Sequence, residues 1–291
     1  MKPIPPSELI LNKDDSIYHL NLRPEQLSDT VILVGDPGRV EKVSKFFDQI
    51  THTSEKREFK SATGVLNKKR ITVLSTGIGP DNIDIAMNEL DALANVDFNT
   101  KTIKEDLRSL EFIRIGTSGA LQPEIPVDSF IIGTYGLGLN STLHAYKCGT
   151  INNLSLSRAF VSHTQWHKNR AMPYAFSCDS DLLSKLKDPT IFTGITATAD
   201  GFYGPQGRVI RLPLQDAHIN EKIASFRYEN TKITNFEMET AAIYGLAKLM
   251  GHRAISINAV IANRATGTFS KNAHHTIEKL IQYTLEKLTQ S

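Results

Sequence analysis

Short apolar runs alternate with apolar stripes of helical spacing along the chain. Residues 30–35 (TVILVG) form a continuous apolar run that ends in a turn over 36–38, which is typical of a buried strand. Beyond the turn, apolar residues recur at intervals of three and four, which predicts one face of a helix that starts near Val40. These residues are Val43, Phe46, Phe47 and Ile50. We therefore expect a strand, a glycine-containing turn and a helix in this segment.

The same order of elements recurs further along the chain. Residues 70–75 are strand-like, residues 76–81 form a turn, and a helical stripe follows. The stripe comprises Ile83, Met87, Leu90 and Ala94. Further β-rich runs lie at 112–115, 129–133, 192–197 and 254–261, and helical stretches lie near 237–250 and 274–288. This alternation predicts an α/β fold in which helices flank a central mixed or mostly parallel β-sheet.

The chain has no clear boundary between two domains. Its 291 residues suit one large α/β domain, and no repeat of fixed period is present. Residues 96–110 are polar and charged but short, so we interpret them as a surface insertion and not as a linker. We expect a single domain that spans residues 1–291.

Charge and cysteine content exclude several classes of protein. The chain has 33 Lys and Arg against 31 Asp and Glu, a net charge of +2, and therefore no broad basic field for a nucleic acid. Its two cysteines, Cys148 and Cys178, cannot supply a four-ligand zinc site. No segment has the roughly 18 consecutive apolar residues of a membrane span, and the N-terminal residues lack a secretory pattern. We expect a cytoplasmic protein that binds neither nucleic acid nor membrane.

Glycine-containing turns follow three of the predicted strands, at residues 35–39 (GDPGR), 76–79 (TGIG) and 116–119 (GTSG). In an open α/β sheet, ligands bind at the carboxyl ends of the strands, where glycines let backbone amides approach an anion. Arg39 and Arg114 lie beside two of these turns, and arginine offers a planar fork of donors for phosphate. Each turn taken alone is better explained by the tight bend that glycine permits. The turns match neither a dinucleotide fingerprint nor a P-loop.

A serine hydrolase is an alternative interpretation of one of these turns. Residues 116–120 (GTSGA) differ only at the last position from the G-x-S-x-G motif of α/β-hydrolases. The histidines available as a base, His252, His274 and His275, have no diagnostic spacing. No H-E-x-x-H motif is present, which argues against a catalytic metal.

Two carboxylates lie at the start of the predicted helix near 237–250. Acidic residues in a first turn often complement the helix dipole. Glu237 and Glu239 are two residues apart and therefore point to different sides of a helix, so one of them is free to face a ligand. A buried carboxylate requires hydrogen-bond donors, and sugar hydroxyls are suitable donors.

A loop at residues 202–208 (FYGPQGR) combines an aromatic ring, an amide and a guanidinium group. The amide of Gln206 both donates and accepts hydrogen bonds, whereas Arg208 only donates. Together with the ring of Phe202, this set suits a heterocycle that carries carbonyl oxygens. Taken alone, a segment of this kind is more often a loop with a surface arginine than a base pocket.

Seven motifs, in order, resemble those of the nucleoside phosphorylase superfamily of trimeric and hexameric enzymes, and most closely those of its uridine phosphorylases. They lie at residues 18–20 (YHL), 35–40 (GDPGRV), 57–59 (REF), 75–79 (STGIG), 114–119 (RIGTSG), 202–208 (FYGPQGR) and 236–239 (FEME). The resemblance implies the single-domain phosphorylase/hydrolase-like fold, in which residues 1–17 are an N-terminal extension. It also implies an enzyme that cleaves a nucleoside with inorganic phosphate as co-substrate and with neither a metal nor an organic cofactor.

The resemblance implies a role for each matching residue. Arg114, Glu239 and Arg208 would contribute most to catalysis. His19 and Arg57 would act across a subunit interface, so at least a homodimer is expected, with a hexamer as the assembly. No metal is required, and the resemblance leaves open a monovalent ion near Glu58 and Ser75. The full set is Gly35, Arg39, Arg57, Arg114 and Thr117 for phosphate, His19, Met238 and Glu239 for ribose, and Phe202, Gln206 and Arg208 for the base.

Base preference is predicted from residues 260–264 (VIANR). Purine phosphorylases of this superfamily resemble the chain here but carry an aspartate where this sequence has Arg264. With Gln206 and Arg208, this difference favours a pyrimidine nucleoside, and uridine above others. The loop at 204–208 (GPQGR) departs from the uridine phosphorylase pattern, which has proline before glycine and a glutamate between glutamine and arginine. A purine or broad-specificity phosphorylase, a hydrolytic nucleosidase and a non-catalytic nucleoside-binding protein remain alternatives, as do thymidine and deoxyribose substrates.

Overall fold

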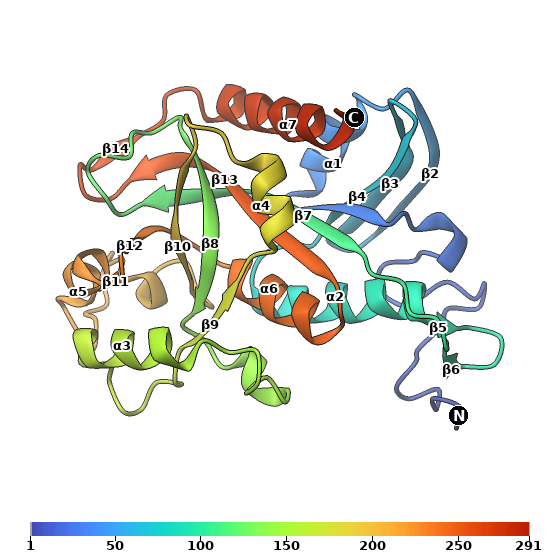
Figure 1. Cartoon of the computed structure of the whole chain (residues 1–291), viewed down its shortest axis with the longest axis horizontal. Helices are drawn as coiled ribbons and strands as arrows, with labels where there is room; N and C mark the ends of the chain where they lie inside the picture. Colours follow the sequence, from blue (N-terminus) through green and yellow to red (C-terminus); the bar gives the residue numbers. More distant parts are fainter. Residues whose placement is uncertain (1, 291) are drawn as a thin grey trace.

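A twelve-stranded mixed sheet forms the centre of the computed structural model, which describes residues 2–290 (Figure 1). Strand order along the sheet is β11-β12-β10-β8-β13-β7-β1-β4-β3-β2, with β9 paired to β8 and β14 paired to β13. The strands are β1 (Thr30–Val34), β2 (Gln49–Lys56), β3 (Phe59–Leu66), β4 (Lys69–Ser75), β7 (Glu111–Ala120), β8 (Phe130–Gly138), β9 (Tyr174–Ser177), β10 (Phe192–Thr198), β11 (Arg227–Tyr228), β12 (Thr231–Glu237), β13 (Arg253–Asn263) and β14 (Thr268–Phe269). The predicted α/β fold with a central mixed sheet is confirmed.

Helices cover both faces of this sheet. Apolar residues of α2 and α6 belong to one core cluster, and those of α1, α4 and α7 belong to a second cluster on the other face (Figure 1). A third cluster packs α3 and α5 against β8, β10 and β12. The helices are α1 (Pro37–Ser44), α2 (Pro80–Asn95), α3 (Leu154–Thr164), α4 (Ser180–Leu186), α5 (Ile219–Ser225), α6 (Thr240–Leu249) and α7 (Ala273–Thr289). Among the helices of residues 2–290, none combines the length and the apolar character that a membrane span requires.

Strand directions bring distant segments to one edge of the sheet. β4, β1, β7 and β13 form one group of mutually parallel strands, and β8, β10 and β12 form a second. Antiparallel pairing of β8 with β13 and of β12 with the end of β7 joins these two groups. Because the carboxyl ends of parallel strands share an edge, the turns after β1 and β4 lie beside the end of β7. The third predicted turn, at 116–119, is wrong, because these residues belong to β7, which continues to Ala120 and pairs there with β13.

The predicted helix after β1 is correct at its start and wrong at its end. α1 begins at Pro37, where the Asp36 carboxylate accepts a 2.9 Å hydrogen bond from the Gly38 N–H, and it ends at Ser44. The Phe47 ring instead packs closely over Gly64 of β3. A Cβ atom at Gly64 would lie only 2.5 Å from the ring, so glycine leaves the space that the ring occupies. Ile50 belongs to β2 and is 47% exposed. The apolar spacing therefore reflects contacts with a neighbouring strand as well as a helix face.

The polar segment 96–110 forms a short hairpin with the start of the chain packed beside it. β5 (Val96–Asp97) pairs with β6 (Thr102–Ile103), and the Ile4 N–H donates a 2.7 Å hydrogen bond to the Lys101 carbonyl. Leu9 and Ile17, from the predicted N-terminal extension, are buried in the core cluster that contains α2. The extension therefore contributes to the core of the protein.

Candidate active site

A cavity of about 760 Å³ opens at the edge where these strands end. Its wall contains most of the residues that the motifs singled out, drawn from segments between residues 35 and 239. These are Gly35, Arg39, Glu58, Arg114, Thr117, Phe202, Gln206, Arg208, Met238 and Glu239. The folded chain thus gathers two glycine turns, the glycine-rich end of β7, the loop at 202–208 and the acidic pair around one space.

Three of the singled-out residues lie outside this wall. His19 is bonded to Glu89 of α2, and Arg57 occupies the turn between β2 and β3 with a φ of 57°. The Ser75 hydroxyl donates a 2.5 Å hydrogen bond to the Glu58 carbonyl and accepts one of 2.8 Å from the Lys60 N–H. Ser75 therefore joins β3 to β4, whereas the Glu58 side chain borders the cavity.

Two buried guanidinium groups form the cationic end of the cavity. Arg39 is 9% exposed and Arg114 is 6% exposed. Arg39 donates a 3.2 Å hydrogen bond to the Ile115 carbonyl, and burial, together with the like charge of Arg114, lowers its pKa. Gly35 and Thr117 line the same region. Because two cations are held close together and away from water, an anion bound here would relieve their repulsion.

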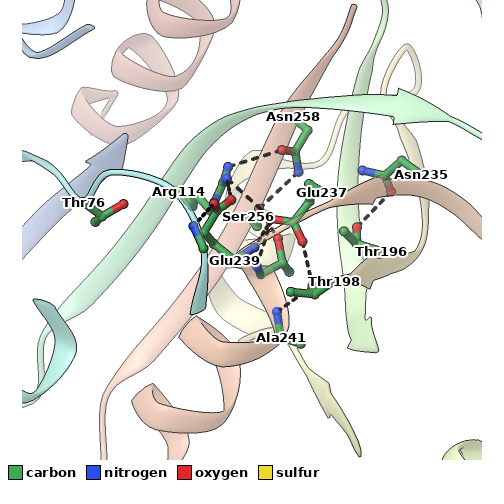
Figure 2. A network of polar contacts seen from close by, with 12 residues as sticks. Thr76, Arg114, Thr196, Thr198, Asn235, Glu237, Glu239, Ala241, Ser256 and Asn258 are labelled. Atoms are coloured by element: carbon green, nitrogen blue, oxygen red, sulfur yellow. Dashed lines mark hydrogen bonds and ion pairs between the residues drawn. The ribbon is translucent and has the colours of Figure 1, made fainter. Parts of the chain in front are cut away.

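Arg114 is held by the acidic pair (Figure 2). Its guanidinium forms a short ion pair with the Glu239 carboxylate, lies 3.5 Å from Glu237 and donates a 3.4 Å hydrogen bond to the Asn258 side chain. Burial opposes the charge of Arg114, but the two carboxylates outweigh burial and raise its pKa. A Cβ atom on Gly116 would lie 1.6 Å from Nη1 of Arg114, so only glycine leaves room for this arrangement.

The acidic pair differs from the prediction that both residues start a helix. Glu237 is the last residue of β12, and Glu239 is the N-cap of α6, which begins at Thr240. One oxygen of Glu237 accepts 2.9 Å hydrogen bonds from the Glu239 and Thr240 N–H groups, and the other accepts a 2.6 Å bond from the Thr198 hydroxyl. Glu237 therefore caps α6, and burial raises its pKa.

Glu239 connects the acidic pair to the turn after β4. Its second carboxylate oxygen accepts a 2.7 Å hydrogen bond from the Gly79 N–H. Gly79 has a φ of 97°, a conformation that glycine adopts readily and other residues rarely adopt. A carboxylate has about four acceptor positions, so Glu239 retains capacity for further donors such as hydroxyl groups.

The opposite end of the cavity is formed by the loop at 202–208. The guanidinium carbon of Arg208 lies 3.8 Å from the centre of the Phe202 ring, and its Nη1 donates to the Phe202 carbonyl at 2.5 Å and to the Gln206 side-chain oxygen at 2.6 Å. Gln206 is 3% exposed. Arg208 uses one of the two acceptor positions of the Gln206 oxygen, and the Gln206 amide N–H groups remain available as donors.

Arg264 adds a second guanidinium behind this end of the cavity. It lies 5.6 Å from the centre of the Phe236 ring, and burial, followed by the charge of Arg208, lowers its pKa to about 10. Its Nη1 is buried and has no hydrogen-bond partner among the described residues. The free polar groups of Gln206, Arg208 and Arg264 are therefore mostly donors.

Sequence reasoning missed Asn258, which helps to orient Arg114. The available signal was a pair of polar residues, Ser256 and Asn258, inside the apolar run 254–261. Residues two apart in a strand point to the same face, and polar side chains on a buried face require partners. The structure supplies them, since Ser256 accepts hydrogen bonds from Asn258 and Thr240.

The serine-hydrolase alternative lacks its base. The Ser118 hydroxyl is buried and has no hydrogen-bond partner among residues 2–290. His252 bonds elsewhere, with Nδ1 accepting from the Leu110 N–H at 3.1 Å and Nε2 lying 3.1 Å from Asp91. A nucleophilic serine needs a base within hydrogen-bond reach, so Ser118 is not activated for attack.

Comparison with known proteins places this cavity in a family. The phosphorylase superfamily profile matches residues 29–290, and the chain belongs to that superfamily. Uridine phosphorylase of Thermococcus kodakarensis is 30% identical over 257 residues, covering 87% of this chain and 80% of the relative. A DeoD-type purine nucleoside phosphorylase of Bacillus velezensis is 26% identical over 284 residues, covering 93% of this chain and 99% of the relative. A Trypanosoma brucei nucleoside phosphorylase with uridine phosphorylase activity superposes with a TM-score of 0.88 at 27% identity, covering 98% of this chain and all of that one.

Proposed function

We propose that this protein is a pentosyltransferase that converts uridine and inorganic phosphate to uracil and ribose 1-phosphate. The observation that carries the proposal is the layout of one cavity, with a buried arginine pair at one end, Glu239 beside it and a donor-rich base loop at the other. These three regions match the three parts of the reaction: an anion, a sugar with hydroxyl groups and a base with carbonyl oxygens. No metal or organic cofactor enters the proposal.

The arginine pair is proposed to bind phosphate. Arg39 and Arg114 supply charged donors, Thr117 a hydroxyl group and Gly35 a backbone contact. Holding phosphate beside the sugar converts a dilute nucleophile into a local one. Arg57 borders no part of this chain's own cavity, which agrees with a role in the site of a neighbouring copy.

Ribose is proposed to lie between the arginine pair and the base loop. Glu239 would accept hydrogen bonds from the 2′- and 3′-hydroxyls, and Met238 would pack against the ring. His19 would meet the 5′-hydroxyl in a neighbouring copy's site. At least a dimer is needed for a complete site, and a hexamer is the assembly we expect.

The base loop is proposed to stabilise the leaving group. A phosphate oxygen bonds to C1′ while the bond between C1′ and N1 of uracil breaks, and its electron pair leaves with the base. Negative charge then spreads to the carbonyl oxygens, where Gln206 and Arg208 donate, and water protonates the departing anion. These donors act most strongly where charge develops, so they favour the transition state over the substrate. Phe202 would cover one face of the base.

The same donors select the base. Uracil and thymine present two carbonyl oxygens, whereas cytosine and adenine present an exocyclic amine, which cannot accept from Gln206 or Arg208. Arg264 adds positive charge to this end of the cavity and has no acidic function that would protonate a purine ring nitrogen. A purine or broad-specificity phosphorylase is the second candidate, because a purine phosphorylase is also a relative.

Release of free base from uridine, thymidine, inosine and adenosine, each with and without phosphate, tests the function. Uracil release that requires phosphate is the expected result. Base release without phosphate would instead identify a nucleosidase, and phosphate-dependent hypoxanthine release at a comparable rate would identify a purine or broad-specificity enzyme. Absence of release from every nucleoside would favour a binding protein.

Arg208→Gln tests the base loop, and Arg211→Gln is its matched control. Arg208 contacts Gln206 and Phe202, whereas Arg211 is exposed in the same loop. Loss of one transition-state donor is expected to lower kcat/KM for uridine by about 10²-fold. Arg211→Gln should retain wild-type kcat/KM, and equal losses in both variants would contradict the assignment.

A further inference from the structure

A carboxylate of α2 holds the segment that contains His19. Glu89 accepts hydrogen bonds from the His19 N–H at 3.0 Å with each of its oxygens, and from the Leu20 N–H at 2.8 Å. It also lies 2.6 Å from Nδ1 of the His19 ring. The His19 and Glu89 side chains are 24% and 14% exposed. Glu89 therefore fixes both the backbone and the ring of one residue.

This contact determines which ring nitrogen of His19 is free. A carboxylate only accepts hydrogen bonds, so Nδ1 carries the hydrogen that Glu89 receives. In the neutral ring, Nε2 is then an acceptor with an available lone pair. The Tyr18 ring meets the imidazole edge-on with 4.7 Å between centroids, and the Phe59 ring lies 6.1 Å away, so the ring plane is restrained as well.

The turn around His19 has hydrogen bonds that do not involve Glu89. The Ile17 N–H donates to the Leu22 carbonyl at 2.8 Å, and the Asn21 N–H donates to the Ile17 carbonyl at 3.0 Å. Leu20 and Leu22 are also buried in the core. The turn has its own means of stabilisation, and the bond from Glu89 to the imidazole is additional to it.

We infer that Glu89 is a positioning residue, which holds His19 in the tautomer whose Nε2 accepts a hydrogen bond from the 5′-hydroxyl of a nucleoside. The inference rests on the proposed function, in which His19 acts in the site of a neighbouring copy. Glu89 itself touches neither substrate. Its effect is selectivity: a nucleoside with a 5′-hydroxyl gains a hydrogen bond that its 5′-deoxy analogue cannot make.

The test compares kcat/KM for uridine with kcat/KM for 5′-deoxyuridine in the wild type, Glu89→Gln and His19→Ala. For histidines that bind metals, the group that orients the imidazole typically contributes 10- to 100-fold to its function, and we take the lower value for His19. We expect Glu89→Gln to lower the preference for uridine by about tenfold, toward the value of His19→Ala, and to lower it no further in the double variant. Asp84→Asn is the matched control, because Asp84 is an acid of the same helix that bonds Tyr146 instead. It should leave the preference unchanged.

Each outcome separates the inference from the function on which it rests. Equal losses for both substrates in Glu89→Gln, with the preference retained, would overturn the inference and leave the function standing. A wild type that releases no uracil from either substrate would overturn the function and the inference together. A second measurement does not depend on the activity of a variant. Nitrogen NMR of the wild type reports which ring nitrogen of each histidine carries hydrogen, and the His19 signal is the one that is missing in His19→Ala. We expect hydrogen on Nδ1 of His19. Hydrogen on Nε2 would overturn the inference.

Discussion

Arg114→Ala is expected to lower phosphate-dependent uracil release by about 10²- to 10³-fold at limiting phosphate. Arg114 is buried at the cationic end of the cavity, where a neutral side chain cannot replace its charged donors. The KM for phosphate should rise at the same time. An unchanged rate at limiting phosphate would contradict the proposed role.

The same substitution is expected to change stability, because Arg114 neutralises Glu239 and Glu237. Removing one partner of a buried ion pair costs about 3–5 kcal/mol in the free energy of unfolding. We therefore expect Arg114→Ala to be less stable than the wild type. If Arg114 had a catalytic role only, the variant would keep full stability. The loss at pH 8 should be measurable by urea unfolding.

The loss of stability in Arg114→Ala should shrink as the pH falls. Burial already raises the pKa of Glu237 and Arg114 opposes that rise, so removing Arg114 raises the pKa further. The folded state then binds more protons than the unfolded chain, in which glutamate titrates near pH 4.3, at roughly its model-peptide value. Stability of the variant therefore falls as the pH rises above that value and recovers toward acid. A deficit that is equal at pH 5.5 and pH 8 would contradict this explanation.

Arg39→Ala is the control that separates phosphate binding from charge pairing. Burial and the neighbouring Arg114 lower the pKa of Arg39, so its removal relieves a repulsion. We expect a raised KM for phosphate without the pH-dependent loss of stability. A deficit in Arg39→Ala like that in Arg114→Ala would indicate a general packing effect.

Gly116→Ala is expected to reduce kcat/KM for phosphate by about 10²-fold, although glycine itself contacts no substrate. The added methyl carbon would lie 1.6 Å from Nη1 of Arg114 and 2.3 Å from the Asn258 side-chain oxygen, so the guanidinium must move. A displacement of about 1 Å in a substrate-positioning group costs on the order of 10²-fold in rate. Steady-state kinetics with varied phosphate measure this effect.

Gly119→Ala is the matched control in the same strand. A Cβ atom there would have its nearest contact with Arg264 at 3.5 Å, which is ordinary van der Waals contact. The KM for phosphate should equal that of the wild type. A Gly116→Ala enzyme with a wild-type KM for phosphate would show that the position of the Arg114 guanidinium does not limit phosphate binding.

Local sequence predicted the strands and two of the three turns of the phosphate end of the site; the third, at 116–119, is the end of β7. A continuous apolar run followed by glycine and a nearby arginine, as at Gly35 and Arg39, specifies a buried strand, a tight turn and a cation within a few residues. These features depend on neighbours in the chain, so periodicity and glycine chemistry are sufficient to find them. The motif order likewise indicated the family, and the matching profile confirms it.

Only the tertiary structure decided which role each residue of the acidic pair has. Local spacing placed Glu237 and Glu239 on different sides of one helix, but it could not show that β12 ends at Glu237. Glu237 caps α6, whereas Glu239 pairs with Arg114, 125 residues away in the chain, and with the Gly79 N–H. The partner of a buried charge is chosen by desolvation, which acts between segments that folding brings together.

Contacts between distant segments also explain where else the structure differs from the sequence-based prediction. The apolar spacing after β1 predicted a helix that continues to Ile50, yet Phe47 packs on β3 at Gly64. Arg264 was recognised by its position in a motif, but its place beside Arg208 follows from the meeting of two loops. The sequence by itself determined the local elements and the chemical groups of the site. The tertiary structure decided which of those groups share a buried space. Pairing and burial depend on distances in space, and separation along the sequence does not determine these distances.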